Sequence, residues 1–425
     1  MLALCVMLTT QDPPKPDETP VEVYLKDGLR FRTKDGMFEA RIGGRFLGHV
    51  RTIFDRPDDD TDPRRTVPNT AFVRQARLEM EGTFYKEWGF KVQTDFGSGT
   101  INQSAFGTGP SNVSGTLRDA FVEWKKYKEF QLRFGQFFEP VSQEDMTSTR
   151  FIDFVERSPI NRLMPGREIG LQAAGTLFDD VLSYAVMALN GGALINDQGR
   201  AVVDREDEKE LAVQLRLKPF VNSGNDILKG LRVGVGASVG TVDSIAATGF
   251  DLVTTELSVL YLDSTVNTFP FDGQRTRIVP QLSWPIGPFC LSAEYVMRED
   301  ELADGAPESE VESTGWYVAA TYILTGEEKK PETRIVPKSD WGAVELAVRF
   351  ANVTVDNAVD AGIAAAGPGN SEEVSTITFG VNWWITRYVR VSVNGIIENY
   401  DEELQFETRL EDSLFGLLFR GQIDF

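Results

Sequence analysis

Apolar and polar residues alternate in short segments along most of the chain from Met37 onward. Between Leu211 and Lys218, for example, leucine and valine side chains take one parity, and Gln214, Arg216 and Lys218 take the other. Segments of about ten residues with this pattern, bounded by Gly, Asp, Asn or Pro, predict β-strands with one apolar and one polar face. We count about seventeen such segments, and an even-numbered barrel of that size has about 16 strands, or 18.

So many strands with one apolar face each need either several β-sandwiches or one closed wall whose apolar side faces lipid. The chain has no clear repeat of about 20–50 residues, which argues against a propeller or a solenoid. It also has no run of roughly 18 apolar residues, and this excludes a transmembrane helix. The mean hydropathy of −0.21 fits a barrel, because only alternate residues face lipid. The sequence therefore predicts an all-β fold, a transmembrane antiparallel β-barrel.

The last segment, Leu414–Phe425, supports this prediction, because it alternates strictly and ends the chain on an aromatic residue. Aromatic residues also end many other segments, as the interface girdles of a membrane barrel require. The links between segments differ in length, which predicts periplasmic turns on one rim and external loops on the other. The short links are at 178–181 and 284–289, and the long ones are near 191–209, 299–311 and 355–373.

One stretch breaks the strand pattern. Leu132–Gln172 begins and ends as a strand, but about thirty residues between these ends are not strand-like, and they include Arg150 and Arg157. A long insert between two barrel strands predicts a loop, at about 138–167, that folds into the lumen and narrows it.

The N-terminus differs from the rest of the chain. Residues 1–11 are apolar but lack the basic start of a secretory signal, so they could be the end of a longer one. Residues 11–20 are polar and rich in proline, as in a linker. We therefore expect an exported protein with a residual signal and linker at 1–20 and a barrel domain at 21–425.

Composition excludes several functions. The formal net charge of −21 argues against nucleic acid as a partner. His49 is the only histidine and the two cysteines are far apart, so neither a metal site nor a thiol enzyme is expected. The chain contains no GxSxG, P-loop, HExxH or CxxC motif. We expect no enzymatic activity, no catalytic residues, no metal and no cofactor.

Strand parity predicts which charged side chains face the lumen. Basic and acidic residues both take the polar parity, so structural ion pairs across strands are expected for most of them. Arg216 and Lys218 on one strand, with Arg275 and Arg277 on another, are the best candidates for a basic ladder, because arginine side chains can pass an anion from one to the next. The alternative is a charge-balanced wall without a binding role. The pore-lining candidates on the strands are Arg77, Lys125, Arg133, Arg216, Lys218, Arg275 and Arg277.

Several sequence segments, and the order in which they occur, resemble the phosphate-selective porin O/P family of trimeric outer-membrane porins. They are Tyr24–Leu29, Phe38–Arg45, Phe72–Glu79, Gly135–Pro140, Thr147–Phe151, Glu156–Ser158 and Pro165–Gly170, together with the C-terminal Phe425. The resemblance implies a barrel of about 16 strands, passive diffusion of anions, and an inward loop with basic residues at the constriction. It assigns that role here to Arg150, Arg157, Arg162 and Arg167. The chain departs from the family at Phe138, where the resemblance leads us to expect a basic residue.

These observations favour an outer-membrane porin, a water-filled channel for passive diffusion of small solutes. Anions such as phosphate are the expected solutes. We expect outer-membrane lipid around the barrel and assembly as a homotrimer. Two alternatives stay open. One is a structural or adhesive outer-membrane barrel with weak or no selectivity, and the other is a secreted soluble β-protein. Conductance of the folded protein in a planar bilayer separates the first from the others.

Overall fold

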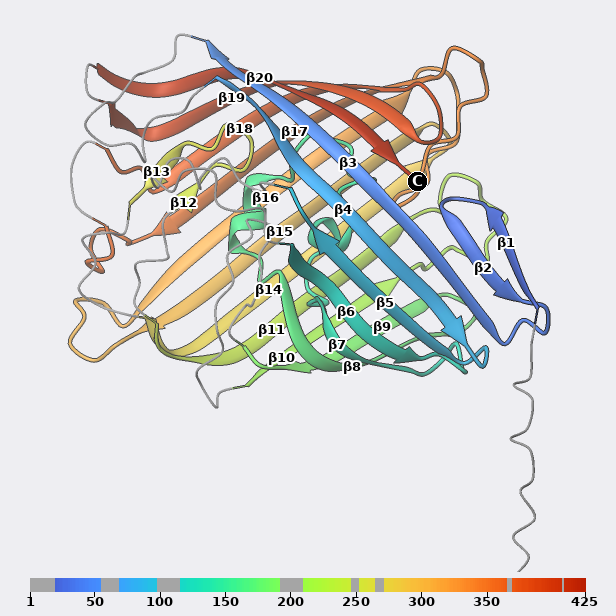
Figure 1. Cartoon of the computed structure of the whole chain (residues 1–425). Coiled ribbons are helices and arrows are strands. Elements are labelled where there is room, and N and C mark those ends of the chain that lie inside the picture. The colour runs from blue at the N-terminus through green and yellow to red at the C-terminus, as the bar shows by residue number, and fades with distance from the viewer. Residues whose placement is uncertain are drawn as a thin grey trace, which may run out of the picture.

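In the computed structural model, the described residues are 20–54, 69–97, 115–191, 209–245, 252–263, 271–364, 369–406 and 409–425. Residues 1–19 of the signal and linker expected at 1–20, and most of the expected loop at 191–209, lie outside these ranges. Within them, sixteen antiparallel strands form a closed barrel (Figure 1). The barrel strands are β3 (Phe38–Phe54), β4 (Thr70–Phe84), β5 (Trp88–Asp95), β6 (Thr116–Trp124), β7 (Gln131–Phe138), β8 (Arg167–Leu177), β9 (Leu182–Leu189), β10 (Glu210–Leu217), β11 (Arg232–Ile245), β14 (Phe271–Ile286), β15 (Phe289–Leu302), β16 (Glu310–Ile323), β17 (Ala343–Asp356), β18 (Glu373–Trp384), β19 (Val389–Phe406) and β20 (Arg409–Asp424).

Pairing of the first and last barrel strands closes the wall. β20 lies antiparallel to β3, with register from Phe415 opposite Phe54 to Asp424 opposite Arg45. Residues 39–42 of β3 extend beyond the end of β20, and there β2 (Leu29–Thr33) pairs with them. β2 forms a hairpin with β1 (Val21–Leu25), so the sheet has two strands more than the barrel. The prediction of about 16 strands is confirmed. We call the end of the barrel that carries this hairpin and Phe425 the terminal rim, and the opposite end the loop rim.

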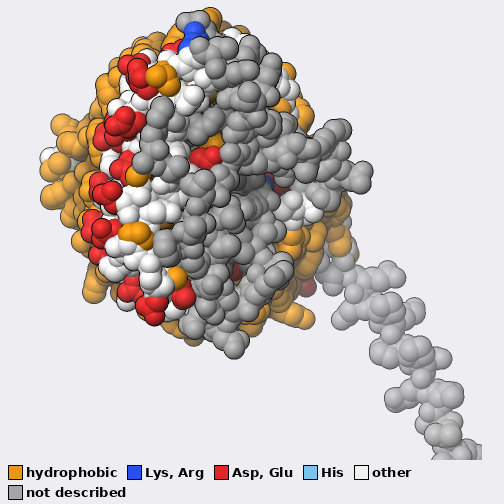
Figure 2. All heavy atoms as spheres, turned by 90° about the vertical axis from the view of Figure 1, so that its left-hand side faces the viewer, with side chains coloured by type: hydrophobic (Ala, Val, Ile, Leu, Met, Phe, Trp, Pro, Cys, Tyr) orange, Lys and Arg blue, Asp and Glu red, His pale blue; other side chains and the backbone are white. Residues whose placement is uncertain are grey.

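The period-two pattern produces a barrel with an apolar outside and a polar inside. On β16, Trp316, Val318 and Tyr322 are exposed on the outer surface, whereas Tyr317 and Thr321 are buried inside. Apolar side chains cover the outer wall seen at the edge of Figure 2. No helix among the described residues is long and apolar enough to cross a membrane. The strands themselves therefore carry the apolar surface that a bilayer requires.

The lengths of the links between strands agree with those expected from the sequence only in part. On the terminal rim, the links at 178–181 and 287–288 are short as expected, but those at 218–231 and 324–342 are long. The expectation of short turns along this whole rim was therefore wrong. On the loop rim, the acidic stretch expected as a long loop at 299–311 is mostly strand, and its link spans only 303–309. Glu299 lies opposite Glu312, which lies opposite Asp356, so like charges line up across β15–β17. Acidic side chains are visible along this rim in Figure 2.

Two segments fold inside the barrel. The pore loop, residues 139–166 between β7 and β8, contains the one-turn helix α2 (Gln143–Met146) and the 3₁₀ helix η1 (Pro159–Leu163). It coincides with the predicted loop at 138–167. The second loop, residues 252–263 between β11 and β14, forms the small hairpin of β12 (Leu252–Val253) and β13 (Leu260–Leu262). The sequence did not indicate that this segment turns inward.

The apolar outer belt predicts how the protein tolerates charge. Val318 lies on β16 between the aromatic residues Trp316 and Tyr322, where the wall faces the hydrocarbon region. Val318→Arg should lower the free energy of unfolding by about 2–4 kcal/mol, because an arginine near the midplane of a barrel wall must leave water. Reversible urea unfolding in lipid vesicles measures this change.

Leu324→Arg is the matched control. Leu324 is 56 % exposed in the link just beyond β16, so the substitution should change the free energy of unfolding by about 1 kcal/mol or less. Equal effects of the two substitutions would contradict the placement of the belt.

Candidate pore constriction

The pore loop crosses the lumen and is bound to opposite sides of the wall. Near its start, Ser142 Oγ donates a hydrogen bond of 2.7 Å to Glu294 on β15. Gly236 on β11 lies directly under the carbonyl group of Val141, where a Cβ atom would have no room. At its middle, the carbonyl oxygen of Asp153 accepts a hydrogen bond of 2.7 Å from Asn382 on β18. Ser148 of the loop accepts a hydrogen bond of 2.6 Å from Arg45 on β3. Because β3 and β11 lie on opposite sides of the barrel, the loop spans the channel instead of lining one side.

Arg157 holds the pore loop together from within. Its guanidinium donates to the carbonyl oxygens of Glu144, Asp145 and Thr147 at 3.1, 2.9 and 2.8 Å. Ser142 also caps α2, since its Oγ accepts a hydrogen bond of 3.1 Å from the backbone amide of Asp145. The first half of the loop is therefore fixed around one buried side chain.

The second loop adds another barrier inside the barrel. Glu256 forms an ion pair of 2.9 Å with Arg349 on β17, and Thr378 on β18 donates a hydrogen bond to the same carboxylate at 2.9 Å. Thr255 Oγ1 donates to the carbonyl oxygen of Arg157 at 2.8 Å, which joins the two loops. The narrow part of the channel is thus built from both loops.

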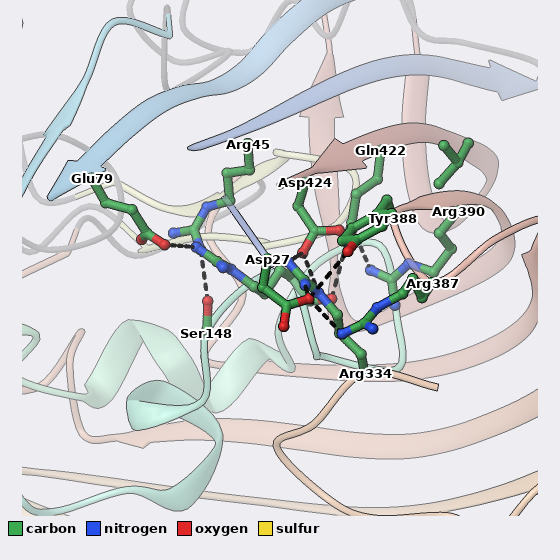
Figure 3. A network of polar contacts seen from close by, with 12 residues as sticks. Asp27, Arg45, Glu79, Ser148, Arg334, Arg387, Tyr388, Arg390, Gln422 and Asp424 are labelled. Carbon is green, nitrogen blue, oxygen red and sulfur yellow. Dashed lines mark hydrogen bonds and ion pairs between the residues drawn. The ribbon is translucent and has the colours of Figure 1, made fainter. Parts of the chain in front are cut away.

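Three wall arginines face the pore loop and bind only neutral acceptors. Arg45 on β3 donates to Gln75 and Ser148, at 3.0 and 2.6 Å. Arg390 on β19 donates to the carbonyl oxygen of Ile152 and to Gln422, both at 2.8 Å. Figure 3 shows Arg45 with Ser148, and Arg390 with Gln422.

Arg420 on β20 is the third of these residues. It donates to His49 Nε2 at 2.9 Å and to the carbonyl oxygens of Thr149, at 3.2 Å, and Val155. We call Arg45, Arg390 and Arg420 the constriction arginines. Among the described residues, none of them forms an ion pair with a carboxylate. Their direct contacts are therefore with neutral groups, and carboxylates such as Glu79, Glu345 and Glu156 act on them only from beyond ion-pair distance. Parity reasoning had not singled these three arginines out as a site.

The four arginines named by the family resemblance, three in the pore loop and Arg167 at the start of β8, lie in different surroundings. Arg150 forms an ion pair of 2.7 Å with Glu79, which also pairs with Arg41. Arg162 donates to the carbonyl oxygen of Thr254 in the second loop at 3.4 Å. Arg167 forms an ion pair of 2.7 Å with Asp119.

Phe138 occupies the place of the expected basic residue. The guanidinium carbon of Arg167 lies 3.7 Å from the centre of the Phe138 ring, and that of Arg157 lies 5.7 Å from it. The aromatic ring thus packs against two arginines and helps to place them, as cation–π contacts do.

Most of the predicted strand residues are engaged in ion pairs. Arg77 pairs with Asp95 at 2.6 Å, and Arg277 pairs with Glu210 at 2.9 Å. Lys218 is half-buried near the terminal rim. The remaining pairs are Lys125 with Glu123 at 3.1 Å, Arg133 with Glu123 at 2.9 Å, Arg275 with Asp300, and Arg216 with Glu332 at 3.8 Å.

The two halves of the candidate basic ladder lie apart. Arg277 is level with Ser238 on β11 and so with Ala212 on β10. Arg216 lies four residues further along β10, roughly 13 Å away at the strand rise of about 3.3 Å per residue. The structure therefore places the four residues in two groups, toward opposite rims, rather than in one row.

The long link 324–342 on the terminal rim reaches back to the constriction, and we call it the strap. Lys329 in the strap pairs with Asp153 of the pore loop and with Glu345 on β17. Arg334 pairs with Asp27 in the β1–β2 turn at 2.9 Å and with Asp424 at the end of β20 at 2.6 Å. Figure 3 shows Arg334, Arg387 and Tyr388 gathered around Asp27. The strap thus connects the N-terminal hairpin and the barrel seam to the pore loop.

The lumen shows no other kind of site in the described ranges. No group of three or more His, Cys, Asp or Glu side chains there is arranged to hold a metal ion. His49 is buried on β3, where it accepts a hydrogen bond from Arg420. Cys290 is buried on β15.

A closed barrel that is apolar outside, polar inside and narrowed by folded-in loops places the protein in the class of outer-membrane porins. The family model described as phosphate-selective porin O and P matches residues 54–414. The chain belongs to this family.

Individual relatives agree with this assignment. The chain is 25 % identical over 415 residues to Porin O of Pseudomonas aeruginosa, covering 88 % of this chain and 86 % of that protein. Its fold is similar to the outer membrane channel DcaP of Acinetobacter baumannii, with a TM-score of 0.56 and 15 % identity over 93 % of this chain and 99 % of that one. It is also similar to the outer membrane protein OmpT of Vibrio cholerae in its trimer form, with a TM-score of 0.52 and 10 % identity over 91 % and 99 % of the two chains.

The contacts of Arg157 predict a large effect of its removal. Arg157→Ala should loosen the first half of the pore loop, because hydrogen bonds to a charged group stabilise by about 1.5–3 kcal/mol each. We expect a higher single-channel conductance and a noisier open state in planar bilayers. Arg150→Ala should change both quantities less, since Glu79 keeps its contacts with Arg41 and Gln93. If Arg157→Ala showed the same single-channel conductance and the same open-state noise as the wild type, the role of this side chain would be contradicted.

Proposed function

We propose that this porin lets small anions, phosphate among them, cross the outer membrane by passive diffusion. The family description and the relative named Porin O support a preference for phosphate-like solutes. In this chain the observation that carries the proposal is the set of constriction arginines. Their acceptors are amide, hydroxyl, carbonyl and imidazole groups, so within the described part of the chain none of the three is in an ion pair with a carboxylate.

The buried position of these arginines strengthens the electric field that they produce in the channel. Arg390 and Arg420 are almost fully buried between the wall and the pore loop. Charges in such surroundings are screened less than charges in open water, so their field extends into the narrow part of the channel. An anion passing the pore loop is stabilised there, whereas a cation is repelled.

Cations elsewhere in the lumen contribute less to this preference. Arg77, Arg133 and Arg277 each face a carboxylate at ion-pair distance. A paired cation adds little net field a few ångströms away, because the two charges cancel. The sign of selectivity therefore depends on the constriction arginines rather than on the number of basic residues.

Removing one constriction charge should weaken the anion preference. Arg390→Gln keeps a donor for the carbonyl oxygen of Ile152 but loses the charge, so the anion-to-cation permeability ratio should fall. Lys338→Gln is the control, since Lys338 lies in the strap and donates to the carbonyl oxygen of Gly326, at the terminal rim. Reversal potentials in a potassium chloride gradient give the ratio for both variants.

An unchanged ratio in Arg390→Gln would contradict the assignment of selectivity to this residue. Folded protein without any conductance would instead favour the alternative of a structural or adhesive barrel, which could present its acidic loop rim to a partner.

We also propose that the protein assembles as a homotrimer. The support is the trimer form of the related fold from Vibrio cholerae. Native mass spectrometry of protein extracted in mild detergent should give a mass three times that of the 47.3 kDa chain. A mass equal to that of one chain would contradict the proposal.

A further inference from the structure

A cavity of about 350 Å³ lies in the inner wall near the terminal rim, away from the pore loop. We call it the vestibule. It is bordered by residues from β2 to the link after β6, with Phe121 and seven charged side chains among them. Two of its four cations, Arg30 and Arg41, are paired with Glu39 and Glu81, and the other charged residues are Lys91, Lys125 and Glu123. A cavity of this size holds a small organic molecule.

Strand register places charges of opposite sign side by side in this wall. Glu81 on β4 lies opposite Lys91 on β5, which lies opposite Phe121 on β6. Neighbouring strands are about 4.8 Å apart, so the row presents a carboxylate, an ammonium group and an aromatic ring at successive short intervals. The Glu123 carboxylate lies directly over the backbone of Gly89, since a Cβ atom there would come within 2.6 Å of one of its oxygens.

The charged groups of the row retain unused hydrogen-bonding capacity. Glu81 accepts a hydrogen bond of 2.9 Å from Arg41 through one carboxylate oxygen, and its side chain is 43 % exposed. Lys91 pairs with Asp119 at 2.8 Å and Lys125 pairs with Glu123 at 3.1 Å. Each ammonium group has three N–H donors, so both lysines can bind a further acceptor.

We propose that the vestibule binds small zwitterions of the α-amino-acid type. The carboxylate of the solute binds Lys91 and Lys125, its ammonium group binds Glu81, and an apolar side chain packs against Phe121. The inference rests on the proposed function only in that the porin lumen gives the solute access to the vestibule.

The same arrangement disfavours a simple anion. A phosphate ion next to Lys91 and Lys125 would also lie near Glu81 and Glu123, whose charges repel it. A zwitterion matches both signs at once. The vestibule and the constriction therefore select different solutes, the first by charge pairing and the second by net positive charge.

Binding of L-phenylalanine to the full chain in detergent, measured by saturation-transfer NMR, tests the proposal. Two analogues serve as comparisons, 3-phenylpropionate without the ammonium group and phenethylamine without the carboxylate. We expect saturable binding of L-phenylalanine and about tenfold weaker binding of each analogue, because each loses one charge-assisted contact.

Variants locate the site. Glu81→Gln and Lys91→Gln should each weaken L-phenylalanine binding by about tenfold. Lys126→Gln is the control and should leave it unchanged, since Lys126 lies in an exposed link and pairs with Glu87 at 2.8 Å.

Two results would overturn the proposal. One is 3-phenylpropionate binding as tightly as L-phenylalanine, which would make the vestibule a plain anion site. The other is no saturable binding of L-phenylalanine to the wild-type chain. Neither result bears on the reversal potential in potassium chloride, so the anion preference of the channel is judged separately.

Discussion

Hydrogen bonds from wall arginines to the carbonyl oxygens of the pore loop are the interaction on which the rest of the channel depends. A loop inside a barrel exposes backbone groups that need partners, and Arg390 and Arg420 supply them at Ile152, Thr149 and Val155. Because the acceptors are neutral, the same contacts that fix the loop leave the positive charge of the arginines in place. Mechanical support and electrostatic selection therefore come from one set of side chains.

Elements that are distant in sequence reinforce this contact. The second loop reaches the pore loop through Thr255 and the wall through Glu256. The strap reaches it from the other rim through Lys329, and is itself held by Arg334 to Asp27 and Asp424. The strap thus ties the terminal rim to the constriction through two separate sets of ion pairs.

The sequence predicts local pattern well and long-range placement poorly. Alternation gave the strands, the outer belt and the strand count, and the irregular stretch after β7 gave the pore loop at nearly its observed bounds. The apolar residues of the second loop, such as Leu257 and Leu260, are equally typical of a strand, so nothing local indicates that they turn inward. Arg390 and Arg420 take the polar parity of their segments just as Arg77 and Arg277 do. Only the fold reveals that the partners of the first two are neutral, whereas the other two face carboxylates.

If arginines without an ion-pair partner at the pore loop set the selectivity, the channel prefers anions. The reversal potential of the wild-type protein in a planar bilayer, across a tenfold gradient of potassium chloride, tests this claim most directly. We expect a potential whose sign reports chloride as the more permeant ion. A potential of the opposite sign, reporting potassium as the more permeant ion, would contradict it.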